Sequence, residues 1–597
     1  MNTRITENID NPAYTIEVIP SKAQFRPGDK LTFKLQFTSD YFSGNEKYSW
    51  SVFDENELVV QGSEKLGQVN SNACHMILDV PVITGGSGAY GLFVTMETAS
   101  GGMIYAETAF DVAEHWREAP RYGFLSDFSP EEAGKLEDVE FLNKHHINLV
   151  QLYDWMYRHD QLLTNTEEFI DPLGRSISHK VVKEKIAACK KLGIASMAYA
   201  AIYGSLPDYA HKHPEQLLYQ NDGRPHSLGN FFHIMDISED SAWTKHIIDE
   251  FVNAILVIGF DGLQLDQYGL PKKAIRKKDG KNEIVALKNL YPRFIDLVRE
   301  AVAERIHDDV VLIYNNVGNY PTHTTAASAL DTMYIEVWDP AFHLRDLKQI
   351  IDNARLWSGK QVVIAAYLHA FHPDKPSIPA QAEYGAIIAM ATIFASGGYH
   401  ILLGEHENLL ADSYFPKYGS LSEQFKVTMQ HYYDFIVMYR NPIYDLELDD
   451  VSMTFAGGIN TEVVFEKEGV SFAPNGDLDT VWTIVKEKPG LMIIHLINLN
   501  GLDNDVWAHA KQQAPTGLEN IVVKVESWEA IESIYLASPD GDSIRSQTIN
   551  YTFVPKGNEC GQFVRFTVPR LDYWTMVCIK TKVGVTADTF DMYTFPD

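Results

Sequence analysis

The sequence predicts a multidomain α/β and β protein, with a central (β/α)8 barrel (a TIM barrel) between two antiparallel β-sandwiches. Three observations support this fold class. Short alternating strands occupy the N-terminal fifth of the chain, eight compact apolar segments alternate with helical patterns through the middle, and alternating strands return at the end. The 597 residues exceed what one hydrophobic core usually organises, so several domains are expected.

Residues 1–118 are predicted to form an N-terminal Ig-like β-sandwich. The segment "KLTFKLQF" follows the turn signal "RPGD" and places Leu31, Phe33, Leu35 and Phe37 on one face. The segment "AYGLFVTMET" repeats the alternation, and Gly-rich turns separate such runs.

Residues 119–445 are predicted to form the barrel, because compact apolar strands there are separated by amphipathic helices such as "HKVVKEKIAACKKLG" and "AWTKHIIDEFVNAILVIG". A doubly wound sheet is the alternative, but it would rarely keep so regular a count. The eight expected strands are "RYGFLSDF", "INLVQLYDW", "GIASMAYAAIY", "GFDGLQLDQYG", "VVLIYNNVG", "TMYIEVWD", "QVVIAAYLHA" and "GYHILLGEH".

Residues 446–597 return to strand patterns and are predicted to form a second, C-terminal β-sandwich. The segments that predict it are "LMIIHLINLNG", "NIVVKVESW", "AIESIYLASPDGD", "QFVRFTVP" and "YWTMVCIK". The expected role of both sandwiches is to pack against the barrel.

Charge and composition exclude several classes of partner. Fifty basic against eighty acidic residues give a net charge of −30, which repels phosphate backbones and anionic membrane surfaces, so we expect neither nucleic acid nor a membrane as partner. No segment approaches ~18 consecutive apolar residues. The N-terminal "MNTRITENIDNPAY" lacks a signal-peptide pattern, so the chain as written is expected to be cytoplasmic, with a secreted protein whose leader was removed as the alternative.

The four cysteines lack CxxC spacing, so neither a zinc site nor a disulfide framework is predicted. Cys189, inside a helical pattern, is expected to be a small buried hydrophobe. We expect no cofactor and no metal.

Two carboxylates are predicted at the ends of barrel strands. In "GFDGLQLDQYG", Leu263 and Leu265 face the helices, so Gln264 and Asp266 belong to the inward row, with Asp266 at the C-terminal end where barrel enzymes build their active sites. Asp261 has the opposite parity and is expected to be structural. In "TMYIEVWDP" the same rule turns Glu336 inward, two strands around from Asp266.

Such a pair is what a glycosidase requires. A retaining enzyme holds its two carboxyl groups about 5–5.5 Å apart, one attacking the anomeric carbon and the other protonating the leaving oxygen, whereas an inverting enzyme separates them by roughly 6.5–9.5 Å.

Sugar-binding side chains are predicted around the two acids, at the ends of the other strands. Aromatic rings stack on the apolar face of a sugar, and carboxylates and amides bond to its hydroxyls. The candidates are Asp127, Tyr153, Asp154, Trp155, Tyr203, Gln264, Asn316, Trp338, His369 and Glu405, with Asn315 and His406 beside them.

The motifs "GFDGLQLDQYG" and "YIEVWD", together with "PRYGFLSDF", "QLYDWMYRH" and "LGEHENLLADSYFP", resemble those of glycoside hydrolase family 66. That family contains endo-dextranases and cycloisomaltooligosaccharide glucanotransferases, and the resemblance extends to the order sandwich, barrel, sandwich. It implies that Asp266 is the nucleophile and Glu336 the acid/base. Around Asp266 the chain departs from the family's usual residues, with Leu263, Leu265, Gln267 and Tyr268.

The resemblance implies a retaining hydrolase that cleaves α-1,6-glucosidic bonds in dextran or isomalto-oligosaccharides, of the endo-dextranase kind. Cyclising members carry a carbohydrate-binding module after the seventh strand, where this chain has only "FHPDKPSIPAQAEYG", so hydrolysis is favoured over cyclisation. The alternative is a transglycosylase that makes linear or cyclic isomalto-oligosaccharides by the same two steps.

Two further alternatives come from other classes. A metal-dependent barrel hydrolase could use His369, His372, His400 and His406, but no HxH pair follows the first strand and no HExxH occurs. A non-catalytic glucan-binding protein would need only the sandwiches and would leave the paired acids unexplained. Calcium in "SPDGD" is a weaker interpretation than a plain turn.

Overall fold

The computed structural model describes residues 16–37, 46–65, 75–83, 86–97, 102–229, 231–412, 416–555 and 562–587. The N-terminal segment on which the expected location rests, together with Cys74 and Cys560, lies outside these ranges.

The central sheet is an eight-stranded parallel sheet that curls into a barrel, which confirms the predicted fold class. Its order is β23-β22-β21-β20-β17-β12-β9-β8, so each strand pairs with the next barrel strand along the chain. The Phe124 N–H donates to the Leu403 carbonyl at 3.1 Å and joins the first strand to the segment after the last. The strands are β8 (Tyr122–Leu125), β9 (Leu149–Leu152), β12 (Ala195–Ala201), β17 (Gly262–Asp266), β20 (Val311–Val317), β21 (Thr332–Glu336), β22 (Val362–Ala365) and β23 (Gly398–His400).

A helix follows each barrel strand. The helix α4 begins where the Ser241 hydroxyl caps the Trp243 N–H and ends at Gly259, whose φ of 98° suits a residue without Cβ. The eight helices are α1 (Glu137–Lys144), α2 (His179–Lys191), α4 (Ala242–Ile258), α5 (Tyr291–Arg305), the single turn α6 (Thr322–Thr325), α7 (Leu344–Ser358), α8 (Pro379–Ser396) and α9 (Glu423–Met438), to which α10 (Arg440–Tyr444) is appended.

Because helices cover the outside and side chains fill the inside, the barrel strands are buried on both faces, as parallel strands usually are. Leu263 and Leu265 are fully buried on the helix-facing side of β17, as their parity predicts. Cys189 is also fully buried, in α2.

The N-terminal region forms two antiparallel sheets over a common core. In β2, buried and half-buried residues alternate from Leu31 to Phe37, as the sequence predicts. One sheet has the order β1-β2-β5 and the other β4-β3-β6-β7. Their bounds are β1 (Ile16–Pro20), β2 (Leu31–Phe37), β3 (Lys47–Asp54), β4 (Glu57–Lys65), β5 (His75–Val80), β6 (Gly88–Glu97) and β7 (Met103–Val112).

The C-terminal region also forms two facing sheets, with the helix α11 (Ser452–Ala456) at one edge. The larger has the order β26-β29-β30-β36-β32-β33 with β28 beside β29, and the smaller β27-β31-β35-β34. Their bounds are β26 (Asp449–Asp450), β27 (Val463–Glu466), β28 (Ser471–Ala473), β29 (Thr480–Lys488), β30 (Leu491–Asn498), β31 (Leu518–Glu526), β32 (Glu529–Ala537), β33 (Gln547–Thr548), β34 (Thr552–Pro555), β35 (Gln562–Leu571) and β36 (Trp574–Thr586).

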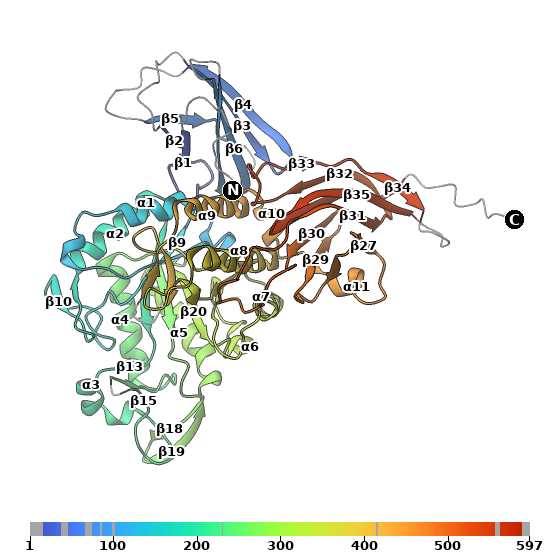
Figure 1. Ribbon diagram of the computed structural model, residues 1–597. Helices are drawn as coiled ribbons and strands as arrows, with labels where there is room; N and C mark the ends of the chain where they lie inside the picture. The colour runs from blue at the N-terminus through green and yellow to red at the C-terminus, as the bar shows by residue number, and fades with distance from the viewer. Residues whose placement is uncertain are drawn as a thin grey trace.

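Both sandwiches pack against the barrel. In Figure 1 the N-terminal sandwich, in blue, lies against α9, and the C-terminal sandwich, in orange and red, lies against α8. The boundaries at 118/119 and 445/446 remain predictions. Within the described ranges, no helix is long and apolar enough to cross a membrane.

The loops at the carboxyl ends of the barrel strands contain small sheets and short helices. The elements of the loops from β12 to α4 and from β17 to α5 lie together at the bottom of Figure 1. These elements are β10 (Glu168–Ile170) with β11 (Ser176–Ser178), β13 (Gly204–Ser205) with β16 (Phe232–Ile234) and β15 (Ser227–Leu228), β14 (Leu218–Tyr219) with β18 (Lys273–Lys278) and β19 (Lys281–Ala286), β24 (Leu409–Asp412) with β25 (Lys417–Gly419), and α3 (Pro207–Lys212).

Candidate active site

The structure places the two predicted acids at the same end of the barrel. Asp266 is the last residue of β17, and Glu336 is the last residue of β21. The strand β20 lies between them and pairs with both. Both side chains line one cavity, which follows from the inward parity predicted for each strand.

One amide joins the two carboxylates. The Nδ2 group of Asn315, on β20, donates to Asp266 Oδ1 at 2.8 Å and to Glu336 Oε2 at 3.1 Å. Since one nitrogen reaches both, these two oxygens lie at most about 6 Å apart, below the roughly 6.5–9.5 Å that an inverting glycosidase needs. The arrangement therefore favours a direct attack by one carboxylate over a water held between them.

Each acid has a second donor. The Tyr199 hydroxyl donates to Asp266 Oδ2 at 2.8 Å, and the Tyr367 hydroxyl donates to Glu336 Oε1 at 3.0 Å. Burial and the negative charge of Glu336 together raise the pKa of Asp266 to about 7, although the hydrogen bonds from Tyr199 and Asn315 favour its charged form. The raised pKa means that Asp266 keeps a proton up to about neutral pH.

The cavity around the acids has a volume of about 650 Å³ and is walled largely by aromatic rings. It is large enough for a small-molecule ligand. Its lining residues are Phe124, Gln151, Tyr153, Asp154, His159, Leu173, Tyr199, Leu228, Gly229, Phe231, Phe232, Gln264, Asp266, Gln267, Tyr268, Asn315, Val317, Tyr334, Glu336, Trp338 and Tyr367.

Four side-chain oxygens on this wall are buried and, among the described residues, lack a hydrogen-bond partner: Gln151 Oε1, Asp154 Oδ1, Gln264 Oε1 and Asn315 Oδ1. Buried acceptors without a donor are rare in folded proteins. A ligand rich in hydroxyl groups would satisfy them.

One side of the cavity is built from loops. The Tyr268 hydroxyl meets His159 Nδ1 at 2.8 Å, and the His159 ring stacks on Phe232 with centroids 4.2 Å apart. Gly204 makes this possible, because a Cβ at that position would lie only 2.0 Å from the Tyr268 hydroxyl oxygen.

Of the sugar-binding residues predicted from the sequence, Tyr153, Asp154, Gln264 and Trp338 lie on the cavity wall. The Asp154 carboxylate accepts from Arg175 at 3.0 Å, which holds it in place at the end of β9.

Trp155, Tyr203 and Asn316 do not lie on the cavity wall, contrary to expectation. The Trp155 indole is fully buried and donates to the Tyr199 carbonyl, and the Tyr203 hydroxyl donates to the Leu270 carbonyl. Asn316 points to the opposite side of β20 from Asn315 and bonds to the Tyr334 carbonyl and the Thr325 hydroxyl.

Asp127, Glu405 and His369 also lie outside the cavity lining. Glu405 is buried and accepts hydrogen bonds from the backbone N–H groups of Ser126 and Asp127, so it joins the segment after β23 to the segment after β8. His369 is exposed in the 3-10 turn η5 (His369–Phe371). Asp261 has the structural role expected of it, accepting from the Ser196 N–H and hydroxyl.

Sequence reasoning missed several aromatic residues of the wall. Tyr199 lies within β12 and shares its inward parity, so the rule that selected Asp266 could have found it. Tyr367 lies two residues beyond the end of β22. His159, Phe231 and Phe232 come from long loops, where no periodicity marks them.

The described histidines at this end of the barrel do not gather into a metal centre. Within the described ranges, no group of three or more His, Cys, Asp or Glu side chains could hold a metal ion. His400 Nε2 instead pairs with the Ala366 carbonyl at 2.7 Å, and burial lowers the pKa of His400 to about 4.

Comparisons of the sequence with family models and with curated proteins agree on one family. The model of glycosyl hydrolase family 66 matches residues 20–578. Two cycloisomaltooligosaccharide glucanotransferases of Niallia circulans are each 24% identical, over 735 and 729 residues, covering 97% and 96% of this chain and 74% and 72% of theirs.

A solved structure gives the same fold. The crystal structure of a Paenibacillus sp. cycloisomaltooligosaccharide glucanotransferase complexed with cycloisomaltoheptaose has a TM-score of 0.81 at 22% identity, covering 94% of this chain and 100% of that chain.

Proposed function

Because this chain belongs to glycosyl hydrolase family 66, we propose that it cleaves α-1,6-glucosidic bonds of isomalto-oligosaccharides with retention of configuration and transfers the released glycosyl group to a sugar hydroxyl. The observation that carries the proposal is the Asn315 amide, which spans Asp266 and Glu336.

In the first step the Asp266 carboxylate attacks the anomeric carbon while Glu336 gives its proton to the departing glycosidic oxygen. The bond from carbon to the leaving oxygen breaks as the bond to Asp266 forms. In the second step Glu336 takes the proton of an acceptor hydroxyl, the acceptor oxygen attacks the same carbon, and Asp266 leaves with its electron pair.

Two observations bear on the acceptor. The names of the relatives support transfer to a sugar, and the aromatic cavity wall offers surfaces on which an acceptor sugar could stack. Hydrolysis is the second candidate. The alignment of this 597-residue chain with the first Niallia circulans enzyme spans 735 positions, so that enzyme carries segments without a counterpart here.

The region after the seventh strand supports linear products over cyclic ones. Only η5 and a short loop separate β22, ending at Ala365, from α8, beginning at Pro379. No room for an inserted module exists within this fully described stretch.

The products formed from isomalto-oligosaccharides and from dextran test the proposal. At high substrate concentration we expect linear isomalto-oligosaccharides longer than the starting sugar, detected by chromatography, with few new reducing ends. If the number of reducing ends instead rises in step with bond cleavage, the enzyme hydrolyses the bonds and does not transfer the glycosyl group. Inactivity on every α-1,6-glucan would overturn the substrate class.

Azide rescue separates the roles of the two acids. Asp266→Ala and Glu336→Ala should each lose at least about a thousandfold in turnover. With an activated α-glycosyl fluoride and azide, Asp266→Ala should yield the β-glycosyl azide, because no covalent intermediate forms. Glu336→Ala should yield the α-glycosyl azide from the intermediate. The opposite pairing of products would exchange the two assignments.

A further inference from the structure

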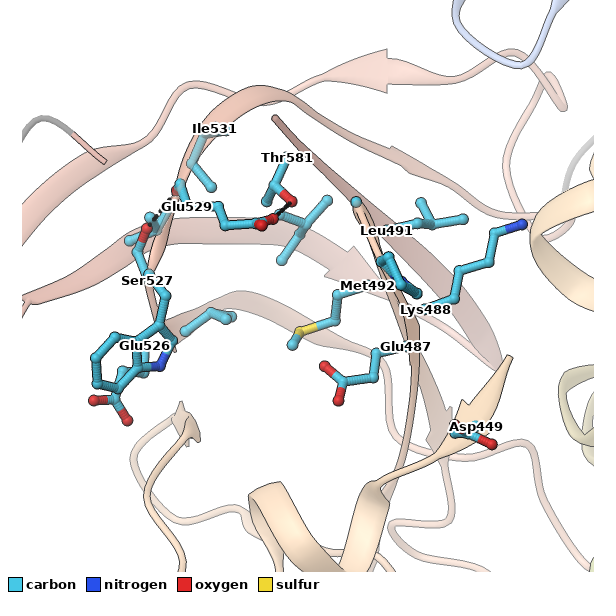
Figure 2. Close-up of a pocket in the computed structure, with 16 residues that line it drawn as sticks. Asp449, Glu487, Lys488, Leu491, Met492, Glu526, Ser527, Glu529, Ile531 and Thr581 are labelled. Atoms are coloured by element: carbon cyan, nitrogen blue, oxygen red, sulfur yellow. Dashed lines mark hydrogen bonds between the residues drawn. The ribbon is translucent and has the colours of Figure 1, made fainter. Parts of the chain in front are cut away.

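A second cavity opens at one end of the C-terminal sandwich, between its two sheets (Figure 2). Its volume is about 440 Å³, within the range of small-molecule sites. The turns β29–β30 and β31–β32 and the strand β36 build it. We call it the sandwich pocket; its lining residues are Asp449, Glu487, Lys488, Pro489, Gly490, Leu491, Met492, Val525, Glu526, Ser527, Trp528, Glu529, Ile531, Val564, Ile579 and Thr581.

The wall of the sandwich pocket combines an apolar floor with an exposed aromatic ring. Val525, Val564 and Ile579 belong to the sandwich core, and Met492 packs against it. Trp528 is 76% exposed, although it lines the pocket. A large aromatic residue left in water beside a cavity offers a flat face for stacking.

Four carboxylates supply hydrogen-bond acceptors in the sandwich pocket. Figure 2 shows the Glu487 carboxylate pointing into the opening beside Met492. The Glu529 carboxylate is held in place, since it accepts from the Thr581 hydroxyl at 2.5 Å and from the Gly584 N–H at 2.9 Å. Asp449 and Glu526 add negative charge to the lining.

The charge of the sandwich pocket disfavours an anionic ligand. Lys488 is the one basic side chain in the described lining, and it pairs with Asp445 and, at 3.6 Å, with Glu447. Figure 2 shows it extending away from the opening. Carboxylate acceptors beside an exposed indole suit a ligand that carries hydroxyl donors and apolar C–H faces.

We propose that the sandwich pocket is a second glucan-binding site, which holds a stretch of a neutral oligosaccharide against Trp528 with its hydroxyls bonded to the carboxylates. The choice of an α-1,6-glucan rests on the proposed function of the barrel. No residue is shared between the two cavities. Holding a long chain at the sandwich raises its effective concentration at the barrel, an advantage that a short oligosaccharide does not gain.

The test removes the ring and leaves the barrel untouched. Trp528→Ala should weaken retention in dextran affinity gels and raise the KM for dextran by about three- to tenfold. Turnover of isomaltotriose should stay within about twofold, because that sugar needs only the barrel. The matched control is Trp357→Ala, which removes another exposed indole, 45% exposed on α7 and outside both cavities.

A second measurement counts sites directly. In the Asp266→Asn background, calorimetric titration with isomaltoheptaose should detect two sites, and adding Trp528→Ala or Glu487→Gln should leave one. Glu487→Gln keeps the size of the side chain, so it serves if the alanine variant loses its fold.

Equal dextran retention in Trp528→Ala, Trp357→Ala and the unsubstituted protein would overturn the proposal. Binding of spermine at this pocket without any binding of isomaltoheptaose would also overturn it and assign a cationic ligand. If the unsubstituted protein binds dextran through Trp528 but cleaves no isomalto-oligosaccharide, the barrel assignment fails and the sandwich pocket stands.

Discussion

Asp266 and Glu336 share one hydrogen-bond donor and interact electrostatically. The Asn315 amide reaches both carboxylates, and the charge of Glu336 is a cause of the raised pKa of Asp266. At this distance the charge of one carboxylate changes how readily the other can be charged. The productive form carries one proton for the leaving oxygen and one negative charge for the attack.

The first prediction concerns pH. Because the pKa of Asp266 is about 7, the proton that this residue holds at lower pH is lost as pH rises, so kcat/KM should fall above pH about 7. Glu336→Gln removes the charge that raises this pKa. With an activated fluoride substrate, which needs no acid, the ionisation of Asp266 in that variant should move below 7.

The measurement is the pH profile of kcat/KM for both proteins. An ionisation that stays near 7 in Glu336→Gln would show that burial alone sets it.

The second prediction concerns stability at the same residue. The pKa of Asp266 is about 7 in the folded protein and 3.8 in an unfolded chain, so the folded state binds the proton more tightly. Its contribution to stability is complete below pH 3.8 and is lost as pH rises through 7. Asp266→Asn should therefore raise the free energy of unfolding by roughly 1–3 kcal/mol at pH 8 relative to its effect at pH 4.

Denaturant unfolding of both proteins at the two pH values measures this difference. An equal effect at pH 4 and pH 8 would mean that Asp266 ionises in the fold as it does in water.

At the scale of elements, strand parity explains which site residues the sequence could predict. Within β17 and β21 alternation is regular, and it places Gln264, Asp266 and Glu336 correctly on the cavity. It would also have chosen Asn315 over Asn316, since neighbouring residues of β20 face opposite sides.

Parity fails beyond the end of a strand. After β9 ends at Leu152, Asp154 has a φ of 49°, which turns the chain and takes Trp155 into the core. Tyr203 likewise follows the end of β12 at Ala201. The eight strands themselves were predictable, because a buried apolar run marks each, whereas the loop residues His159 and Phe232 leave no periodic signal.

The third prediction concerns the junction of three elements. Asp111, at the end of β7, accepts from Arg121 at 2.9 Å and from Arg440 of α10 at 3.3 Å, and both Asp111 and Arg121 are almost fully buried. Asp111→Asn leaves two buried guanidinium groups without a counter-charge. We expect a loss of about 3–5 kcal/mol in the free energy of unfolding.

The control for this junction is Asp79→Asn, which breaks the exposed pair between Lys30 and Asp79 and should change stability little. Denaturant unfolding compares the two variants. Similar small losses in both would mean that water or a shifted side chain compensates the buried arginines.

At the scale of the whole molecule, the three regions are joined unequally. One continuous core contains the barrel interior and the barrel-facing side of the C-terminal sandwich, including Trp482 and Trp574. The N-terminal sandwich has a core of its own and, among the described residues, contributes Ala23, Phe53 and Ala109 to the buried members of the shared core. The barrel and the C-terminal sandwich should therefore unfold together.

The fourth prediction tests this coupling at Trp574, which lies on β36 with its ring 4.9 Å from that of Phe435 on the barrel helix α9. Trp574→Ala opens a cavity between the two regions and should cost about 3–5 kcal/mol. Because one core is shared, the loss of barrel activity on heating and the loss of C-terminal strand structure should shift down by the same several degrees. The exposed Trp528→Ala should shift neither. If Trp574→Ala lowers the melting of the sandwich while barrel activity survives to its original temperature, the two regions fold independently, and contact between them does not stabilise the site.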